Sequence, residues 1–479
     1  MDRNMSFYLL TDCHYLSKEC WDEGLPITKR ERGDQIALKT SPQILDTFLE
    51  KIIADKTTDT VIFLGDNVNS GDMNSHREFR NRLQMLKDAG KNVYISVATH
   101  DYCSPNGEDE CFQKNAVRYT AAGCEPVPFM LRSELFDFYE PFTHRNALSV
   151  DPESGSYVVK IGDKLRMIII IDNGNGRSHC GLFEEGMKWL ESEVDRAAEA
   201  GDYVLFAVHH PVIPPWEVYR HMADFELYGG YRELSALMCK KKVRAVFTGH
   251  THVQNIRRFE GENGRYFFDI STVALVNAGG VMRKVTITGD GKCTVESVGI
   301  DKINGVDTGE KTRFDYLYEL NFTGLIEHAL PYVKSDYDGF LTMTDGLVPV
   351  DKLKKHKMLV KFAVSKVEKL KMSSLAKLVN AKKLLTKEQY KNAENQKALE
   401  SAFVLLRHIY TGNAPFTPGT VENTVFTCAA KRLDRLTNIF NIKPLKNLIP
   451  SGSSFAQMAQ DFLYNNRTGD DDFIEFNLN

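Results

Sequence analysis

The sequence predicts an α/β domain followed by a smaller, mainly helical domain. Three observations indicate this division. The 479 residues exceed the size of one ordinary domain. Apolar strand-like runs alternate with helical stretches up to about residue 300, and this strand signal fades beyond about residue 306. We therefore place the first domain at residues 1–305 and the second at residues 306–479.

Short apolar runs mark the strands of the first domain. In chain order they are FYLL, TVIFLGD, NVYISVA, MIIIID, YVLFAVHHP, VRAVFTGH and YFFDIST. Such runs are typical of strands that are buried on both faces. Helices are expected at residues 42–53 and 183–200, and a closing hairpin turns at Gly-Asp-Gly, residues 289–291. In this fold class, the loops at the carboxyl ends of buried strands are the expected place for a site.

The second domain carries helix signals. Thr386 and Gln389 have the spacing of a capping box. Apolar residues keep helical spacing over residues 399–410, and Gly412 is expected to end that helix. A further amphipathic helix is expected over residues 421–440.

A lysine-rich segment lies at the start of the second domain. Eleven lysines stand between Lys352 and Lys383, against one acidic residue, Glu368. A basic amphipathic helix of this kind is either a solvated outer face, which is the commoner case, or a surface for nucleic acid or an anionic membrane. The acidic tail GDDDFIEFNLN is expected either to be disordered or to dock against these lysines.

The composition excludes several classes of protein. A hydrophobic content of 42% argues against disorder, and a formal charge of −4 gives no basic field over the whole surface. No run approaches the ~18 apolar residues of a membrane span. The nine cysteines are odd in number and scattered, unlike the dense even sets of small secreted scaffolds. We therefore expect reduced thiols and a soluble protein in the cytoplasm.

Metal-binding side chains follow the apolar runs at five places. Taken alone, each of these patterns is more often a turn or a chance occurrence. Because the carboxyl ends of parallel strands meet at one edge of a sheet, side chains distant in sequence can share one pocket there. Carboxylates and imidazoles suit manganese, iron and zinc. The residues are Asp12 and His14 after FYLL, Asp66 after VIFLG, His100 and Asp101 after VYISVAT, His209 after VLFAV, and His250 and His252 after AVFTG.

The same residues, in the same order, resemble the motifs of the calcineurin-like metallophosphoesterases. The resemblance covers roughly residues 6–300 and implies a layered α/β/β/α fold with a dinuclear metal centre. The matching motifs are Asp12-Cys13-His14, Gly65-Asp66, Ala98-Thr99-His100-Asp101, His209-His210-Pro211 and Gly249-His250-Thr251-His252.

The resemblance implies two divalent or mixed-valence ions of manganese, iron or zinc. Asp66 would bridge them. His210 matches a position that is not usually a ligand. The remaining ligands divide between the ions, with Asp12, His14 and His252 at the first ion and Thr99, His209 and His250 at the second.

The expected reaction is the hydrolysis of a phosphoester. One residue between His250 and His252 lets each imidazole face a different ion of a pair about 3.5 to 4 Å apart, and Gly249 permits the tight exit from the strand. Such a pair lowers the pKa of a bound water and places the hydroxide in line with the leaving oxygen. His100 would approach the phosphate and stabilise its developing charge, with Asp101 as its orienting partner.

The third motif departs from the family pattern. The family normally has Gly-Asn before the histidine, where this chain has Ala98 and Thr99. Threonine offers a neutral hydroxyl on a shorter arm than the asparagine carbonyl. The second ion is therefore expected to bind more weakly than the first.

Several substrates and one different class of function stay open. The helical second domain and the sequence GDNVNSG resemble the cyclic-nucleotide phosphodiesterase branch of the family. Other phosphodiesters or phosphomonoesters are alternative small-molecule partners. Because Thr99 replaces the usual asparagine, one alternative is that the chain binds metal poorly and acts as a protein-interaction scaffold. The presence of the other predicted ligands counts against this alternative. The lysine-rich segment raises a nuclease as a third possibility.

Overall fold

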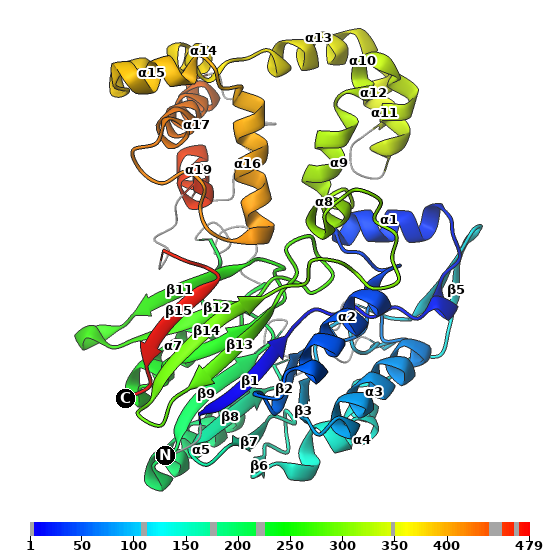
Figure 1. Cartoon of the computed structure of the whole chain (residues 1–479), viewed down its shortest axis with the longest axis vertical. Coiled ribbons are helices and arrows are strands. Elements are labelled where there is room, and N and C mark those ends of the chain that lie inside the picture. The colour runs from blue at the N-terminus through cyan, green and yellow to red at the C-terminus, as the bar shows by residue number, and fades with distance from the viewer. Residues whose placement is uncertain are drawn as a thin grey trace. The chain divides into compact units, whose positions relative to one another are not determined.

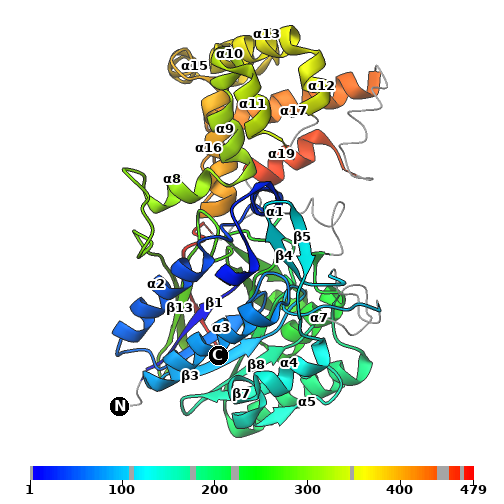
Figure 2. The ribbon, with the colours of Figure 1, turned by 90° about the vertical axis from the view of Figure 1, so that its right-hand side faces the viewer.

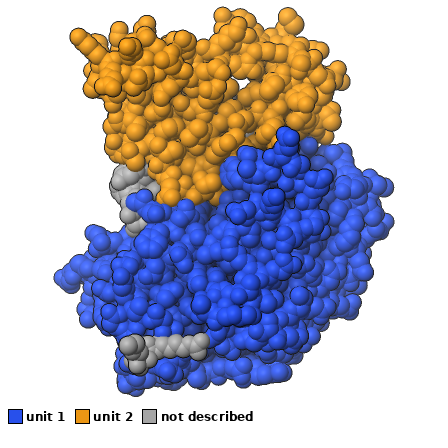
Figure 3. Space-filling model, viewed as in Figure 1, with its two compact units in different colours: residues 1–215, 225–317, 468–479 blue, residues 216–224, 318–467 orange. Residues whose placement is uncertain are grey.

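The computed structural model describes residues 4–106, 113–172, 180–216, 226–345, 350–439, 453–463 and 469–479. The chain divides into two compact units (Figure 3). The first contains residues 1–215, 225–317 and 468–479, and the second contains residues 216–224 and 318–467. The tail therefore belongs with the first unit, although it was expected in the second domain. The division into domains 1–305 and 306–479 stays a proposal.

Two sheets form the centre of the first unit (Figure 1). The six-stranded sheet has the order β15-β14-β13-β1-β2-β3, and β1, β2 and β3 are parallel. Every residue of β2 is buried, as its uninterrupted apolar sequence predicts. The strands are β1 (Met5–Leu10), β2 (Thr60–Leu64), β3 (Asn92–Ser96), β13 (Met282–Ile287), β14 (Lys292–Val298) and β15 (Phe473–Asn477).

The seven-stranded sheet has the order β11-β12-β10-β9-β8-β7-β6. Its central strands β8, β9, β10 and β12 are parallel. The bounds are β6 (Ser149–Val150), β7 (Tyr157–Ile161), β8 (Leu165–Ile170), β9 (Tyr203–Val208), β10 (Ala245–Thr248), β11 (Asn255–Glu260) and β12 (Tyr266–Ser271).

The two sheets pack face to face, and helices cover their outer faces. The rings of Phe7 and Phe247 lie 5.7 Å apart between the sheets, and the Tyr157 hydroxyl donates to the Ile95 carbonyl at 2.7 Å. Helices α2 (Ser41–Ala54) and α3 (Met73–Asp88) lie beside the first sheet (Figure 2). Helices α5 (Glu184–Ala200) and α7 (Tyr231–Lys241) pack against the second. The predicted layered α/β/β/α fold is confirmed.

Shorter elements complete the first unit. They were not predicted, because each is too brief to show a clear period in the sequence. They are α1 (Leu25–Asp34), α4 (Arg132–Phe138), a small hairpin of β4 (Val117–Thr120) and β5 (Gly123–Pro126), and the 3₁₀ turns Lys18–Cys20, Glu140–Phe142, His144–Asn146 and Glu262–Gly264. Helix α8 (Arg313–Tyr318) lies at the end of the segment 225–317, and its last residue, Tyr318, falls in the second unit.

The second unit is helical in the part that the structure describes. Thr386 and Gln389 form the predicted capping box, and Gly412 ends α16 with a φ of 67°. Its elements are α9 (Phe322–Ala329), α10 (Tyr332–Ser335), α11 (Tyr337–Met343), α12 (Val350–Lys355), α13 (Lys357–Glu368), α14 (Met372–Leu378), the 3₁₀ turn Ala381–Leu384, α15 (Lys387–Ala393), α16 (Ala398–Thr411), α17 (Val421–Ile439) and α19 (Phe455–Leu463).

The acidic tail forms an edge strand. Strand β15 pairs antiparallel with β14, and the buried Arg283 donates to the Asp471 carbonyl at 2.7 Å. The ring of Phe476 lies 5.0 Å from that of Phe268. Both expectations for the tail, disorder and docking on the lysines, are wrong, because β14 offers an unpaired edge that the tail completes.

Two expectations concern the chain as a whole. The cysteines within the described ranges are all free thiols. In those ranges, every helix is too short or too polar to span a bilayer.

We predict that Phe476→Ala lowers the free energy of unfolding by about 3 kcal/mol, since it removes a buried ring from the sheet. Phe473→Ala on the same strand is the matched control. Phe473 is 46% exposed and Phe476 is 7% exposed, so the control should change stability by no more than about 0.5 kcal/mol. Urea unfolding measures both, and equal losses would contradict the pairing of the tail.

Candidate metal centre

The predicted site residues follow strands whose carboxyl ends meet at one edge. Backbone hydrogen bonds continue the pairing beyond the strands. The Asp12 amide donates to the Gly65 carbonyl at 3.1 Å, and the His14 amide donates to the Asp66 carbonyl at 2.9 Å. On the other sheet, the Gly249 amide donates to the His209 carbonyl at 2.9 Å. The motif segments are therefore held together by their backbones before any side chain contributes.

Left-handed backbone is concentrated at the predicted ligands. This conformation is costly for residues other than glycine and persists where the surrounding structure imposes it. Ten such residues occur in the part of the chain that the structure describes, and five are predicted ligands. Their φ angles are 51° at Asp12, 39° at His14, 48° at Asp66, 65° at His250 and 55° at His252.

Two glycines let these strand ends approach. A β-carbon at Gly249 would collide with the Thr11 hydroxyl and lie 2.5 Å from Asp12 Oδ2. Gly65 has a φ of 101°, and a β-carbon there would lie 2.6 Å from that of Ala98. The close approach explains why glycine precedes the ligands in both motifs.

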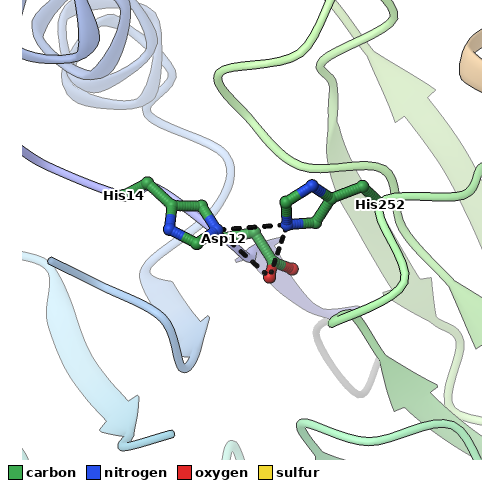
Figure 4. A group of neighbouring side chains, drawn as sticks. All are labelled: Asp12, His14 and His252. Carbon is green, nitrogen blue, oxygen red and sulfur yellow. Dashed lines mark hydrogen bonds and ion pairs between the residues drawn. The ribbon is translucent and has the colours of Figure 1, made fainter. Parts of the chain in front are cut away.

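The first group of side chains contains Asp12, His14 and His252 (Figure 4). The Nε2 atoms of the two histidines lie 3.1 Å apart, and the Nε2 atom of His252 is 3.3 Å from Asp12 Oδ1. That oxygen is buried and makes no hydrogen bond of good geometry among the described residues. Ligand atoms about 2.1 Å from a tetrahedral ion are ~3.4 Å apart, so this spacing fits an ion between them.

The second group contains Asp66, His209 and His250. The Nε2 atom of His209 is 3.2 Å from Asp66 Oδ2, and its Nδ1 atom lies 3.0 Å from the Leu64 carbonyl. Since a carbonyl accepts only, Nδ1 carries a proton. Although burial opposes it, Asp66 and Asp12 raise the pKa of His209 to about 10, so Nε2 is protonated as well and faces Asp66. A bound ion would replace that proton. Asp66 also groups with His14 and His100. One carboxylate is thus placed between the two sets of ligands.

The carboxylates of this pocket stay ionised although they are buried. Burial alone would raise the pKa of Asp66, but His209 and His100 hold it well below its usual range. Burial opposes ionisation of Asp12 in the same way, and His209 and His252 keep its pKa low. Burial lowers the pKa of His14, which favours its neutral form. Ionised carboxylates and neutral imidazoles are the forms that bind metals.

His100 is fixed by a backbone group. Its amide donates to Asp66 Oδ1 at 2.9 Å, and its Nδ1 atom donates to the Asn69 carbonyl at 2.7 Å. The ring centre lies 4.7 Å from that of His14. The Asn69 carbonyl therefore orients the ring, whereas the Asp101 carboxylate, which was predicted for this role, accepts from backbone amides. The catalytic roles of both residues stay predictions.

Asp101 instead joins two of the motif loops. Its buried carboxylate accepts from the amides of Asn67, Val68 and Ala98 at 2.8, 3.0 and 2.8 Å. Burial and the neighbouring Asp66 raise the pKa of Asp101 to about 7. The side chain supports the loops that carry Asp66 and His100.

Thr99 is buried between Ala98 and His100, and its carbonyl accepts from the Gln113 side chain at 3.4 Å. Its role as a ligand of the second ion stays a prediction. His210 is held by Asp172, whose Oδ2 atom is 3.0 Å from His210 Nδ1. Asp172, Cys180 and His210 form a further group of possible ligands, separate from the two sets above, and leaving His210 out of the ligand set stays a prediction.

A sequence model of a known family matches residues 5–254, slightly more than half of the chain, and the family is the calcineurin-like phosphoesterases. The chain belongs to this family.

One curated relative is a probable glycerophosphodiester phosphodiesterase from Arcobacter nitrofigilis. It is 27% identical over 195 residues, which cover 40% of this chain and 56% of the relative. The match thus spans little more than half the length of that relative.

Two solved structures are similar at low identity. A dimetal phosphatase from Danio rerio is 12% identical, with 62% of this chain and 97% of that chain covered and a TM-score of 0.43. The purple acid phosphatase PPD1 from yellow lupin seeds is 13% identical, with 62% and 52% covered and a TM-score of 0.40.

Glu226 is a residue of the site that the family motifs did not indicate. Its Oε2 atom lies 2.5 Å from His250 Nε2. Because that nitrogen faces Glu226, Nδ1 is left to face an ion. A carboxylate behind a metal-binding histidine fixes the ring and raises its basicity. Glu226 follows no apolar run, so no strand-end signal could have identified it.

Asp269 is a second unpredicted residue, and it supports two ligand loops at once. It accepts from the amides of Val212 and Ile213 at 2.8 and 2.7 Å, and from the Thr248 hydroxyl at 2.6 Å. These segments follow His209 and precede His250. The sequence signal for Asp269 was its position as the single charged residue inside the apolar run YFFDIST.

We predict that Glu226→Gln weakens Mn²⁺ binding at the second ion by about tenfold, because the amide keeps a hydrogen-bond acceptor but loses the charge. The exposed Glu262→Gln is the matched control and should bind as the unmodified chain does. Calorimetric titration measures both proteins. Unchanged binding in Glu226→Gln would show that Glu226 does not act through His250.

Proposed function

We propose that this chain hydrolyses phosphoesters with two metal ions held at the edge where its two sheets present their motif loops. The observation that carries the proposal is the position of Asp66, which groups with His14 of the first set of ligands and with His209 and His250 of the second. Asp12, His14 and His252 would hold the first ion. Thr99, His209 and His250 would hold the second.

The donor atoms fit such ions. Asp12 Oδ1 and His209 Nε2 are buried and make no hydrogen bond of good geometry within the described ranges, although His252 Nε2 and Asp66 Oδ2 lie 3.3 and 3.2 Å from them. An unpaired buried polar atom costs free energy, and a cation at this place would satisfy both. Manganese, iron and zinc all accept carboxylate and imidazole ligands. Two bound ions would polarise phosphate oxygens and lower the pKa of a water molecule.

His100 is the proposed catalytic side chain. Its link to the Asn69 carbonyl sets its tautomer, and its amide ties it to Asp66. The ring is therefore held beside Asp66, the proposed bridge. We assign it to neither set of metal ligands. We propose that the imidazole stabilises the negative charge that develops on the phosphate during hydrolysis.

A phosphodiester is the proposed substrate class. The relative from Arcobacter nitrofigilis is named a probable glycerophosphodiester phosphodiesterase. A cyclic nucleotide stays the specific candidate from the sequence. The scaffold alternative is disfavoured by the convergence of so many donor atoms. The cytoplasm is the proposed location, because the cysteines are scattered and odd in number.

Metal analysis of the purified chain, together with an assay panel in Mn²⁺, tests the proposal. The panel contains bis-p-nitrophenyl phosphate, p-nitrophenyl phosphate, cyclic AMP and single-stranded DNA. Two ions per chain with turnover of the diester are expected. Absence of both metal and turnover would favour a scaffold, and preferential cleavage of DNA would favour a nuclease.

Asp66→Asn is expected to abolish turnover and leave the fold largely intact, because it removes the negative charge that both ions would share. The exposed Asp88→Asn is its control and should remain active. Turnover, metal content and circular dichroism are measured together. Near wild-type turnover and metal content in Asp66→Asn would refute the shared bridge.

For His100→Ala we expect normal metal content and a rate lower by about 10² to 10⁴. The lost imidazole acts on the phosphate and not on the ions. Metal content is compared with that of His252→Ala, which should lose metal. If both variants lose metal equally, His100 is a ligand.

Thr99 sets the affinity of the second ion in this account. Activity should rise with Mn²⁺ in two phases, and Thr99→Asn should move the weaker phase to lower metal concentration by adding a carbonyl ligand. Thr99→Val, which keeps the shape and removes the oxygen, should move it to higher concentration. Rate and calorimetric titrations measure the phases. If neither variant moves the weaker phase, Thr99 is not a ligand.

A further inference from the structure

Helix α13 of the second unit (Figure 1) has two apolar faces. Val360 and Val364 pack against a buried cluster made of residues from α9, α10 and α11. On the other face, Met358, Leu359 and Phe362 are 79%, 63% and 62% exposed. The internal packing of the unit therefore does not account for the exposed apolar side chains.

Positive charge surrounds this exposed apolar face. Eight lysines occur between Lys352 and Lys371. The acidic residue in that range, Glu368, pairs with Lys334. The Lys366 ammonium lies 5.3 Å from the centre of the Phe362 ring. Further exposed lysines close to the apolar face in the sequence are Lys354 and Lys355, at the end of α12. The Lys357 ammonium, in contrast, lies 5.2 Å from the ring centre of Tyr337 in the buried cluster.

The combination of apolar and basic side chains limits what can cover the face. Single exposed apolar residues are normal, but neighbouring ones on one helix mark a docking surface. Nucleic acid would bind the lysines and leave the three apolar side chains in contact with phosphates or water. An anionic bilayer satisfies both, because apolar side chains enter the boundary of the acyl chains while lysines reach the headgroups.

We propose that α13 is a peripheral docking site for anionic lipid surfaces. The surface, which we call the α13 face, comprises Met358, Leu359 and Phe362 together with the exposed Lys354, Lys355 and Lys366. The helix would lie in the plane of the interface with these apolar residues toward the lipid. This inference is independent of the proposed phosphoesterase activity, because none of its residues belongs to the metal centre.

The test is co-sedimentation of the full chain with vesicles in EDTA. One set is pure phosphatidylcholine, and the other also contains phosphatidylserine. Binding to the second set is expected, and it should weaken as salt screens the lysines. The triple variant Met358→Ser, Leu359→Ser, Phe362→Ser should lower the partition coefficient by at least about tenfold. Met85→Ser, which removes a methionine 53% exposed on α3, is the matched control and should bind normally.

Hydrolysis of bis-p-nitrophenyl phosphate is measured on separate aliquots of the three proteins, in Mn²⁺ without EDTA or vesicles, and should be equal in all three. The docking proposal can therefore fail while the proposed activity is confirmed, and the proposed activity can fail while docking is confirmed. Vesicle binding that is unchanged in the triple variant would overturn the proposal. So would binding of duplex DNA without vesicle binding, or self-association of the chain that the triple variant abolishes without any vesicle binding.

Discussion

The site depends on a backbone constraint at the strand ends. Asp12, Asp66 and His250 each leave a strand in a left-handed conformation that L-residues rarely adopt. The parallel pairing and two closely packed glycines impose it. Each left-handed residue turns its side chain into the space beyond the sheet edge.

Charge explains why the pocket is suited to cations. Two carboxylates, Asp12 and Asp66, are buried within reach of His209. Their proximity would be unfavourable without positive charge, and the imidazoles supply it in the metal-free chain. Bound ions would take over that role and release the histidines to act as neutral ligands. Asp269 supports the loops that carry His209 and His250, and Glu226 holds the ring of His250.

Much of the fold and of the site was predictable from the sequence. Because buried parallel strands must end at one edge, the order of motifs from Asp12 to His252 predicts their convergence. Contacts made by backbone atoms were not predictable, and the Asn69 carbonyl that holds His100 is one of them. Pairing of the tail depends on a distant strand edge, which leaves no local pattern. The second apolar face of α13 was not predicted, because the lysines of this helix indicated an ordinary solvated surface.

The central claim is that Asp66 joins two metal ions. The most direct measurement is a crystal structure of the Mn²⁺-loaded chain with anomalous scattering recorded at the manganese edge. The account predicts two anomalous peaks about 3.5 to 4 Å apart with Asp66 between them, the first next to Asp12 and the second next to His209. A single peak, or two peaks with Asp66 bound to neither or to one alone, would contradict it.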